Sequence, residues 1–559
     1  MLLSRQCSDF ESWTLLRYSL ALLEDIKYRL HVTQQPWMKI PRLSDMMGAG
    51  SSSSPAKPTR VVIHHEQYSL GQTTGGLSVL FTTLCIVDLF GVFPIVALPK
   101  SVISCGIYGI PLVLAVFALQ LYTAVLLGRS WILAQELSPS IREKSRFPYA
   151  AVADLAFGIH AKRLVTFLLN ATIFGAGVPN FIFAAQSMQM FWWKITGGEV
   201  EVSYCVWMVL IGLLLCPVMW LGSPKDMKPI ALTSVGIVFA VAACTWACII
   251  TDRDSPAAAP VSQPAARDFL VAYGIMAFQF DIHPMLLTLQ VDMRDGRRVA
   301  RAAAGGFLAT GALFGVTALL AACRYGERVQ TNILQGMPPS VTLYIVALLV
   351  TLQLCLSSAV GNSALFQQVE GLLRVPREFG FKRCLIRSGI VILAVFLGES
   401  VPRFDVVMGL VGSTLTGPLM FIFPPLFFLK LCYVKKRQTE ETMILLNEAE
   451  IKPYSSKQNG GLNQNGDLSK LPLIYHDACS VEYSTFRSRY DFVHNDYDIK
   501  WYDVVLAMTV MLMGVAATIV GTYSSWSDAI SSATFTQPCL VNSTAAARSF
   551  ILFSTHEDD

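Results

Sequence analysis

The stretch CIVDLFGVFPIVALPK, residues 85–100, is apolar enough to cross a membrane, yet it contains groups that a plain span avoids. Asp88 lies near its middle, Gly91 and Pro94 follow, and Pro99-Lys100 closes it. Proline interrupts a helix because it has no backbone N–H, and an acidic side chain is costly in lipid. The stretch therefore predicts a membrane helix that is broken close to a carboxylate.

The composition of the whole chain agrees with a membrane protein. Of 559 residues, 53% are hydrophobic and 15% are charged, whereas a soluble domain carries roughly a quarter charged residues. Apolar runs of about 18 or more residues recur, each long enough for a bilayer core of roughly 30 Å. The short alternating segments of a β-barrel are absent from the sequence. We therefore predict an all-α polytopic membrane protein.

The apolar runs predict eleven transmembrane helices. The ninth run is short, and the tenth is longer than a bilayer requires, with candidate break points at Gly417-Pro418 and Pro424-Pro425. The predicted spans are 77–99, 107–135, 164–193, 204–221, 229–250, 268–289, 302–323, 340–363, 385–398, 404–433 and 501–523.

The polar segments divide the chain into five regions. Residues 1–75 read as a largely disordered cytosolic tail, 76–434 as the transmembrane core of spans 1–10, and 435–500 as a polar cytosolic loop. Span 11 covers 501–523, and 524–559 form an extracellular or luminal tail. Four cysteines fall near the outer face, so a disulfide among them stays open: Cys105, Cys205, Cys323 and Cys539.

Basic residues set the orientation. With the N-terminus in the cytosol, the inner loops next to the spans hold 19 Lys and Arg residues and the outer segments hold 8, which is the asymmetry that cytosolic loops show. The sequence Asn542-Ser543-Thr544 is a glycosylation acceptor in the tail that this topology puts outside. We predict a cytosolic N-terminus, an external or luminal C-terminus and a glycan at Asn542.

A second broken helix is predicted five spans after the first. Span six, FLVAYGIMAFQFDIHPMLLTLQVDM, residues 269–293, contains Asp281, His283 and Pro284 between two apolar halves. Broken helices are tolerated in lipid where they line a cavity. In secondary transporters, two such helices in matching positions of inverted repeats form the substrate site. The two breaks therefore predict one midplane site.

These motifs resemble those of the amino acid/auxin permease family, which includes vesicular inhibitory and proton-coupled amino acid transporters. The segment DIHPMLLTLQVDM (281–293) is similar to the sixth span of that family, and QQVEGLL (367–373) is similar to its stretch after span eight. The resemblance covers roughly residues 75–525. It implies a LeuT-like core of two inverted five-helix repeats plus one helix. It also implies amino acid transport by alternating access, driven by H⁺ or Na⁺; of the two we predict H⁺.

The first span departs from the family pattern at two positions. Asp88 stands where the family usually has Asn, and Pro94 follows Gly91 where the break is usually glycine-rich. If Asp88 faces the cavity, it could hold a substrate ammonium, bind Na⁺ or carry the coupled proton; the alternative is a structural hydrogen bond to a neighbouring span.

Further site candidates follow from the second break and from span eight. His283 is a candidate for a proton relay, or else for a hydrogen bond to a carbonyl. Asp281 is expected to cap the second half-helix or to contact substrate, and Phe280 to gate it. Ser357 and Ser358 are candidate Na⁺ ligands, unless they bond carbonyls of their own helix.

The sequence contains no nucleotide-binding motif, so neither a primary pump nor another enzyme is predicted. We expect no cofactor besides the coupling ion, no metal site and no nucleic-acid partner; the expected partners are an amino acid and the lipid bilayer.

The host membrane is either the plasma membrane or a lysosomal or vesicular membrane. The alternative function is a transporter-like amino acid sensor or scaffold with little or no transport.

Overall fold

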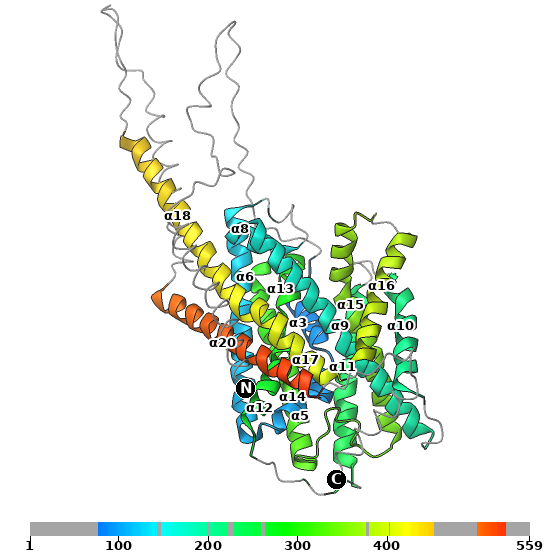
Figure 1. Ribbon diagram of the computed structural model, residues 1–559. Helices are drawn as coiled ribbons and strands as arrows, with labels where there is room; N and C mark the ends of the chain where they lie inside the picture. Colours follow the sequence, from blue (N-terminus) through cyan, green and yellow to red (C-terminus); the bar gives the residue numbers. More distant parts are fainter. Residues whose placement is uncertain are drawn as a thin grey trace, which may run out of the picture. The chain divides into compact units, whose positions relative to one another are not determined.

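The computed structural model describes residues 76–139, 141, 147–197, 202–220, 227–253, 255–256, 258, 263–375, 380–401, 403–451 and 500–532. This part of the chain is helical, and its one β contact is an isolated bridge between Leu77 and Met293. The all-α prediction is therefore confirmed for the described residues (Figure 1).

The helices differ in length, and several follow one another with only a short break. In chain order they are α3 (Val79–Phe90), α4 (Phe93–Val96), α5 (Leu98–Ile103), η1 (Gly106–Tyr108), α6 (Gly109–Leu137), α8 (Pro148–Phe157), α9 (Ile159–Ile195), α10 (Tyr204–Trp220), α11 (Met227–Thr251), α12 (Ala266–Gln279), α13 (His283–Asp292), η2 (Gly296–Arg298), α14 (Val299–Arg324), α15 (Val341–Leu372), α16 (Phe381–Ser400), α17 (Phe404–Val411), η3 (Gly412–Thr416), η4 (Pro418–Ile422), α18 (Phe423–Ile451) and α20 (Trp501–Ser532).

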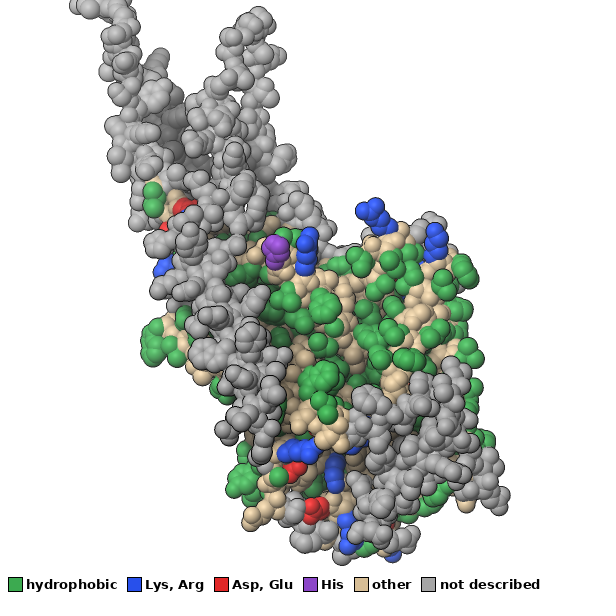
Figure 2. Space-filling view, in the orientation of Figure 1, with side chains coloured by type: hydrophobic (Ala, Val, Ile, Leu, Met, Phe, Trp, Pro, Cys, Tyr) green, Lys and Arg blue, Asp and Glu red, His purple; other side chains and the backbone are tan. Residues whose placement is uncertain are grey.

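Within the described residues, 8 helical segments are long and apolar enough to cross a membrane. Figure 2 shows the corresponding surface: apolar side chains cover the face between Lys and Arg side chains that gather near its two ends. The other predicted spans coincide with α3, which is interrupted, with α10, which has 17 residues, and with α16. A polytopic membrane protein is thus supported, while the number eleven stays a prediction.

Two helices extend beyond their predicted ends. Helix α18 continues to Ile451, where we expected the polar loop to begin at 435, and α20 continues to Ser532. In α18 the polar continuation carries an ion pair one helical turn apart, with Arg437 Nε 2.9 Å from Glu441 Oε1. Such pairs stabilise a helix outside the apolar region, so an apolar run marks the membrane part of a helix but not its end.

The tenth predicted span departs from α-helical geometry close to where a break was expected. Segments η3 and η4, on either side of Gly417, are π-helical. The wider turn lies where η3 packs very closely on α12: a Cβ added to Gly412 would come within 2.2 Å of the Gly274 carbonyl oxygen. π-helical turns inside α-helices frequently occur at functional sites.

The two broken helices lie against different neighbours and touch each other. Helix α3 packs on α11, α14 and α15, whereas α12 packs on α17, η3 and α20. They are joined where the start of α3 meets the end of α13: Leu77 N–H donates to the Asp292 carbonyl (2.8 Å), and Arg294 N–H donates to the Leu77 carbonyl (3.0 Å). The long helices α9 and α15 pack along each other; α15 also packs on α3, and α9 packs on α13.

The cysteine prediction is settled for three of the four residues. Cys205 is disulfide-bonded, whereas Cys105 and Cys323 carry free thiols. Cys539 lies outside the described residues.

Candidate functional site

The first break lies between Phe90 and Phe93. Helix α3 ends with Gly91, whose φ of 61° lies in the left-handed region and whose N–H donates to the Val87 carbonyl. Pro94 is in the first turn of α4, where a missing N–H costs no helical hydrogen bond. Glycine therefore supplies the turn, and proline starts the following helix.

The second break shares the proline in the first turn of the following helix but has no glycine. Helix α12 ends at Gln279, and α13 begins at His283 with Pro284 in its first turn. Asp281 Oδ1 accepts the His283 N–H at 3.0 Å. Asp281 thus accepts a hydrogen bond from the first N–H of α13, whose N-cap residue is Ile282; of its two predicted roles, contact with substrate stays a prediction.

The two breaks are in direct contact. Gln279 Nε2 donates to the Phe90 carbonyl at 2.5 Å, and the rings of Phe90 and Phe280 pack edge to face with centroids 5.3 Å apart. Phe280 is fully buried and also packs on Phe117 and Phe307. The structure places it in this aromatic cluster, while Phe278 borders the cavity instead. The predicted gating role of Phe280 stays a prediction.

A cavity of about 130 Å³ lies at the meeting point of the breaks. Helices α3, α9, α12, α13, α15 and the π-helical segment η3 contribute its walls. Five of the residues singled out in the sequence border it: Gly91, Asp281, Pro284, Ser357 and Ser358. The structure therefore brings residues from the first, sixth and eighth predicted spans to one place.

The cavity wall presents polar atoms that lack partners. Within the described part of the chain, five side-chain oxygens that border the cavity accept or donate no hydrogen bond: Thr172 Oγ1, Gln279 Oε1, Asp281 Oδ2, Gln353 Oε1 and Thr416 Oγ1. Buried polar atoms are normally satisfied, and an orphaned group calls for an explanation. A bound ligand that donates hydrogen bonds would satisfy them.

Asp88 does not border this cavity. Its carboxylate is buried and lies beside the Ser234 hydroxyl of α11 and the Gln353 amide of α15. Gln353 Nε2 in turn is 3.4 Å from Ser234 Oγ. Because Gln353 itself borders the cavity, Asp88 occupies the layer behind the wall. Asp88 is thus placed beside two neighbouring helices, which is the second of its two predicted alternatives, and its role in ion or substrate binding stays a prediction.

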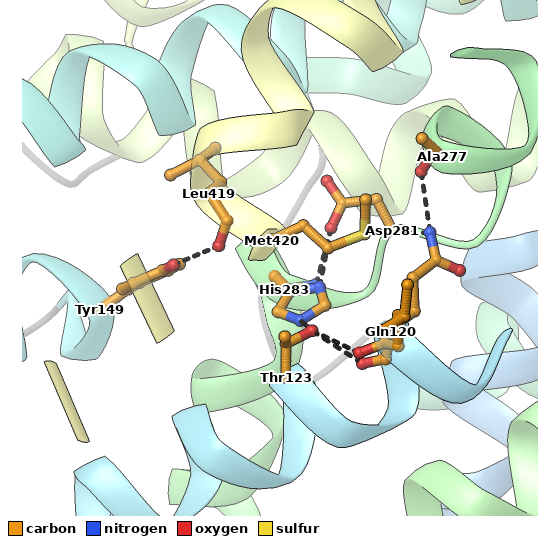
Figure 3. Close-up of polar contacts among 9 residues, drawn as sticks. Gln120, Thr123, Tyr149, Ala277, Asp281, His283, Leu419 and Met420 are labelled. Atoms are coloured by element: carbon orange, nitrogen blue, oxygen red, sulfur yellow. Dashed lines mark hydrogen bonds and ion pairs between the residues drawn. The ribbon is translucent and has the colours of Figure 1, made fainter. Parts of the chain in front are cut away.

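His283 also lies behind the wall, on the other side. Figure 3 shows its ring between Asp281 and Thr123 of α6. Nδ1 is 3.1 Å from Asp281 Oδ1, and Nε2 is 3.0 Å from Thr123 Oγ1. Both ring nitrogens are therefore engaged by side chains and not by backbone carbonyls.

Span eight contributes a small polar network. Ser358 Oγ accepts a hydrogen bond from Asn180 Nδ2 of α9 at 3.1 Å, and Asn362 Nδ2 donates to the Ser358 carbonyl at 3.0 Å. Both serines border the cavity, so their proposed role as ion ligands stays a prediction.

Among the cavity residues that the sequence analysis did not name are three polar ones with an unpartnered oxygen: Gln279, Gln353 and Thr416. For Gln353 a signal existed, because residues 353, 357 and 361 follow one another at four-residue spacing and share one helix face. Gln279 stands two residues before Asp281. Thr416 stands next to Gly417, where a break was predicted, and is the last residue of the π-helical segment η3.

Two further predictions concern ions and glycans. Across the described ranges, no group of three or more His, Cys, Asp or Glu side chains could hold a metal ion. Asn542 lies outside the described residues.

Comparison with known proteins identifies the family. Residues 78–447 match the model of the transmembrane amino acid transporter protein family, which is more than half of the chain. The chain belongs to this family. The matched region contains both breaks and every residue that borders the cavity.

Individual members of the transmembrane amino acid transporter family are distant relatives. Amino acid transporter AVT1D of Arabidopsis thaliana is 24% identical over 360 residues, covering 62% of each chain. Vacuolar amino acid transporter 3 of Schizosaccharomyces pombe is 22% identical over 68% of this chain and 57% of its own length. Sodium-coupled neutral amino acid symporter 2 of Danio rerio is 27% identical over 30% of this chain and 34% of its own. The chain thus spans less than two thirds of each of these relatives.

Proposed function

We propose that this protein is a secondary active transporter that moves an amino acid across a membrane by alternating access, with H⁺ as the coupling ion. The observation that carries the proposal is that two interrupted helices border one cavity whose wall presents unpartnered oxygen atoms. Family membership supports an amino acid as the substrate.

The fold that goes with this function is a LeuT-like core of two inverted repeats of five spans plus an eleventh span. Helices α3–α5 would be its first span and α12–α13 its sixth. Both are broken by the same construction, a short non-helical turn followed by a proline in the first turn of the next helix. This correspondence supports the repeat assignment.

The proposed substrate is small and carries no net negative charge. Asp281 is the one ionisable side chain among the described residues that border the cavity, and its free Oδ2 would accept an ammonium group. The cavity of about 130 Å³ is below the roughly 300–1,000 Å³ of drug-sized sites. A small neutral amino acid fits both the volume and the charge.

The proposed location is an internal membrane of the vacuolar or lysosomal kind, with the N-terminus in the cytosol. The relative from S. pombe is named for the vacuole, and the Lys and Arg asymmetry supports the orientation.

The test is uptake by reconstituted vesicles of a panel of radiolabelled amino acids, with an H⁺ gradient, with a Na⁺ gradient and with none. We expect accumulation of at least one small neutral amino acid that requires the H⁺ gradient and is lost with a protonophore. Accumulation driven by Na⁺ alone would reassign the coupling ion. Binding without gradient-driven accumulation would instead identify an amino acid sensor.

A further inference from the structure

A buried polar triad lies directly behind the cavity wall. It consists of Asp281, His283 and Thr123, with His283 in the middle (Figure 3). The His283 and Thr123 side chains are fully buried, and Asp281 reaches the cavity with its unpartnered Oδ2. The same carboxylate therefore belongs both to the cavity and to the triad.

The hydroxyl of Thr123 has a choice of partners. Its oxygen lies 3.0 Å from the Leu119 carbonyl and 3.1 Å from the Gln120 carbonyl, both in its own helix. It also lies 3.0 Å from His283 Nε2. A hydroxyl rotates, so it can donate to a carbonyl while accepting from Nε2–H, or donate to Nε2. Thr123 can consequently serve either form of the imidazole.

Two proton states satisfy every contact of the triad. In the proton-loaded state, His283 is an imidazolium that donates from Nδ1 to Asp281 and from Nε2 to Thr123, which donates to a carbonyl. When the proton leaves, His283 keeps the hydrogen on Nδ1, and the Thr123 hydroxyl turns to donate to Nε2. One proton is gained or lost, and neither state leaves a ring nitrogen without a partner.

The surroundings of the triad contain few groups that would compete for this proton. Helix α8 presents Tyr149, which interacts with Asp281 and donates to the Leu419 carbonyl. Helix α6 presents the neutral Gln120, which donates to the Ala277 carbonyl and contacts Met420 of η4. The elements packed on α13 also carry these charged or titratable residues: Tyr122, Arg129 and Glu136 of α6, Asp154 of α8, His160, Lys162, Arg163 and Lys194 of α9, and Arg297 and Arg298 of η2.

Charge balance links this proton to the substrate. Without the proton, the Asp281–His283 pair carries one negative charge, and an amino acid zwitterion adds no net charge. The loaded cavity would then hold an uncompensated buried charge, which is costly. One proton on the Asp281–His283 pair brings the net charge of the pair and the bound zwitterion to zero. No Lys, Arg or His among the described residues borders the cavity, so none of them supplies the positive charge instead.

We propose that the Asp281–His283–Thr123 triad is the binding site of the coupled proton, and that substrate binding and proton binding at this site favour each other. This inference rests on the proposed function for its second half only. It assigns the proton to the second break, whereas the acid at the first break, Asp88, lies beside neutral amide and hydroxyl groups.

The first test needs no substrate. Infrared difference spectra of the purified protein between about pH 5 and pH 8 should contain an imidazole protonation band that disappears in His283→Gln. In Thr123→Val the band should remain but change in frequency, because Nε2 of His283 loses its hydrogen-bond partner in both proton states. Thr245→Val removes another fully buried threonine hydroxyl, on α11, and should behave as the wild type. If the spectrum is the same in wild type and His283→Gln, the proton site is wrong, whatever the protein transports.

The second test measures proton uptake on substrate binding, in weak buffer with a pH indicator, for an amino acid found in the vesicle assay. Wild type and Asp88→Asn should take up about one proton per bound molecule, and His283→Gln none. Loss of the uptake in Asp88→Asn with retention in His283→Gln would overturn the proposal in favour of the first break. A positive first test together with no accumulation in vesicles would leave the proton site standing and refute the transport function.

Discussion

At the scale of single residues, Gly91 combines two requirements of the first break. Its φ of 61° is strained for any residue with a side chain, and a Cβ there would lie 3.1 Å from Gln353 Nε2 and 3.3 Å from Gln353 Oε1. Gln353 borders the cavity. The absence of a side chain at Gly91 therefore allows both the turn and the position of a cavity residue.

We expect Gly91→Ala to destabilise the folded protein by roughly 1–2 kcal/mol, because a residue with a Cβ is strained in left-handed backbone. Thermal unfolding in detergent measures the change. Gly361→Ala is the matched control: Gly361 borders the same cavity, and a Cβ there meets no atom within 4 Å. Equal effects of the two substitutions would contradict the assignment.

The residue scale also shows the limit of sequence reasoning. Glycine and proline mark a break wherever it occurs, so Gly91, Pro94 and Pro284 could be placed from their chemistry alone. Which side chains reach the cavity depends on the rotation of each helix and on its neighbours. The Asp88 carboxylate lies beside Gln353, and the Phe280 ring packs on rings from α3, α6 and α14. Neither contact can be predicted from the residues next to Asp88 or Phe280 in the sequence.

At the scale of elements, a buried ion pair joins α15 to α16. Arg387, 1% exposed, donates from Nε to Glu370 Oε1 at 2.6 Å and from a terminal nitrogen to the Met219 carbonyl of α10 at 2.5 Å. Its guanidinium also lies over the Phe366 ring, 5.2 Å from the centroid. These three helices lie together in Figure 1, and the pair fixes their ends to one another.

Removing one member of this pair should cost more than removing both. Glu370→Gln leaves a buried guanidinium without its counter-charge, at about 3–5 kcal/mol, and should lower Tm markedly. The double variant Glu370→Gln/Arg387→Met should regain most of the loss. Thermal unfolding in detergent of the two single variants and the double variant checks this; strictly additive changes in Tm would show that the residues do not interact.

A second cluster connects the end of α11 to the end of α14. The Asp252 carboxylate accepts hydrogen bonds from Ser255 Oγ (2.6 Å) and Tyr325 Oη (2.9 Å), and Arg324 lies 3.5 Å away. Burial alone would raise the pKa of Asp252, but these bonds and the Arg324 charge outweigh it and lower the pKa below its usual value. The charged form is therefore the stabilising one.

This direction fixes the pH dependence of an Asp252→Asn variant. A lowered folded-state pKa gives stability that is present above the unfolded value of about 3.9 and is lost as pH falls through the folded value. Asp252→Asn should thus lower Tm by the same amount throughout about pH 5–8, and the difference from wild type should shrink only at more acidic pH. A difference that already vanishes near pH 6 would refute the assignment.

At the scale of the whole molecule, the apolar runs predicted where helices lie, since each predicted span coincides with a helix of the structure. Burial in lipid selects such runs directly, so composition was sufficient. The continuation of α18 to Ile451 and the π-helical turns of η3 and η4 depend on ion pairs and on close packing. Those features follow from neighbours in space and could not be read from hydropathy.

The orientation of the molecule can be tested through its glycan. If the C-terminal tail is outside the cytosol, the protein expressed in eukaryotic cells should lose apparent mass on treatment with an N-glycosidase, and Asn542→Gln should abolish that change. Asn170→Gln is the control, because Asn170 also stands in an acceptor sequence but lies within α9. A glycan that persists in Asn542→Gln would be attached to another residue. Absence of a glycan from the wild type would contradict the predicted external position of the tail.

The π-helical turns also set the rotational register of everything that follows them. Residues 412–422 wind more loosely than an α-helix, and after them Lys435 of α18 reaches Glu136 of α6, with Nζ 2.7 Å from Oε2. Deleting one residue from this stretch would turn α18 by about 100° about its axis and carry Lys435 away from Glu136. The loose winding of residues 412–422 therefore determines which face of α18 meets α6.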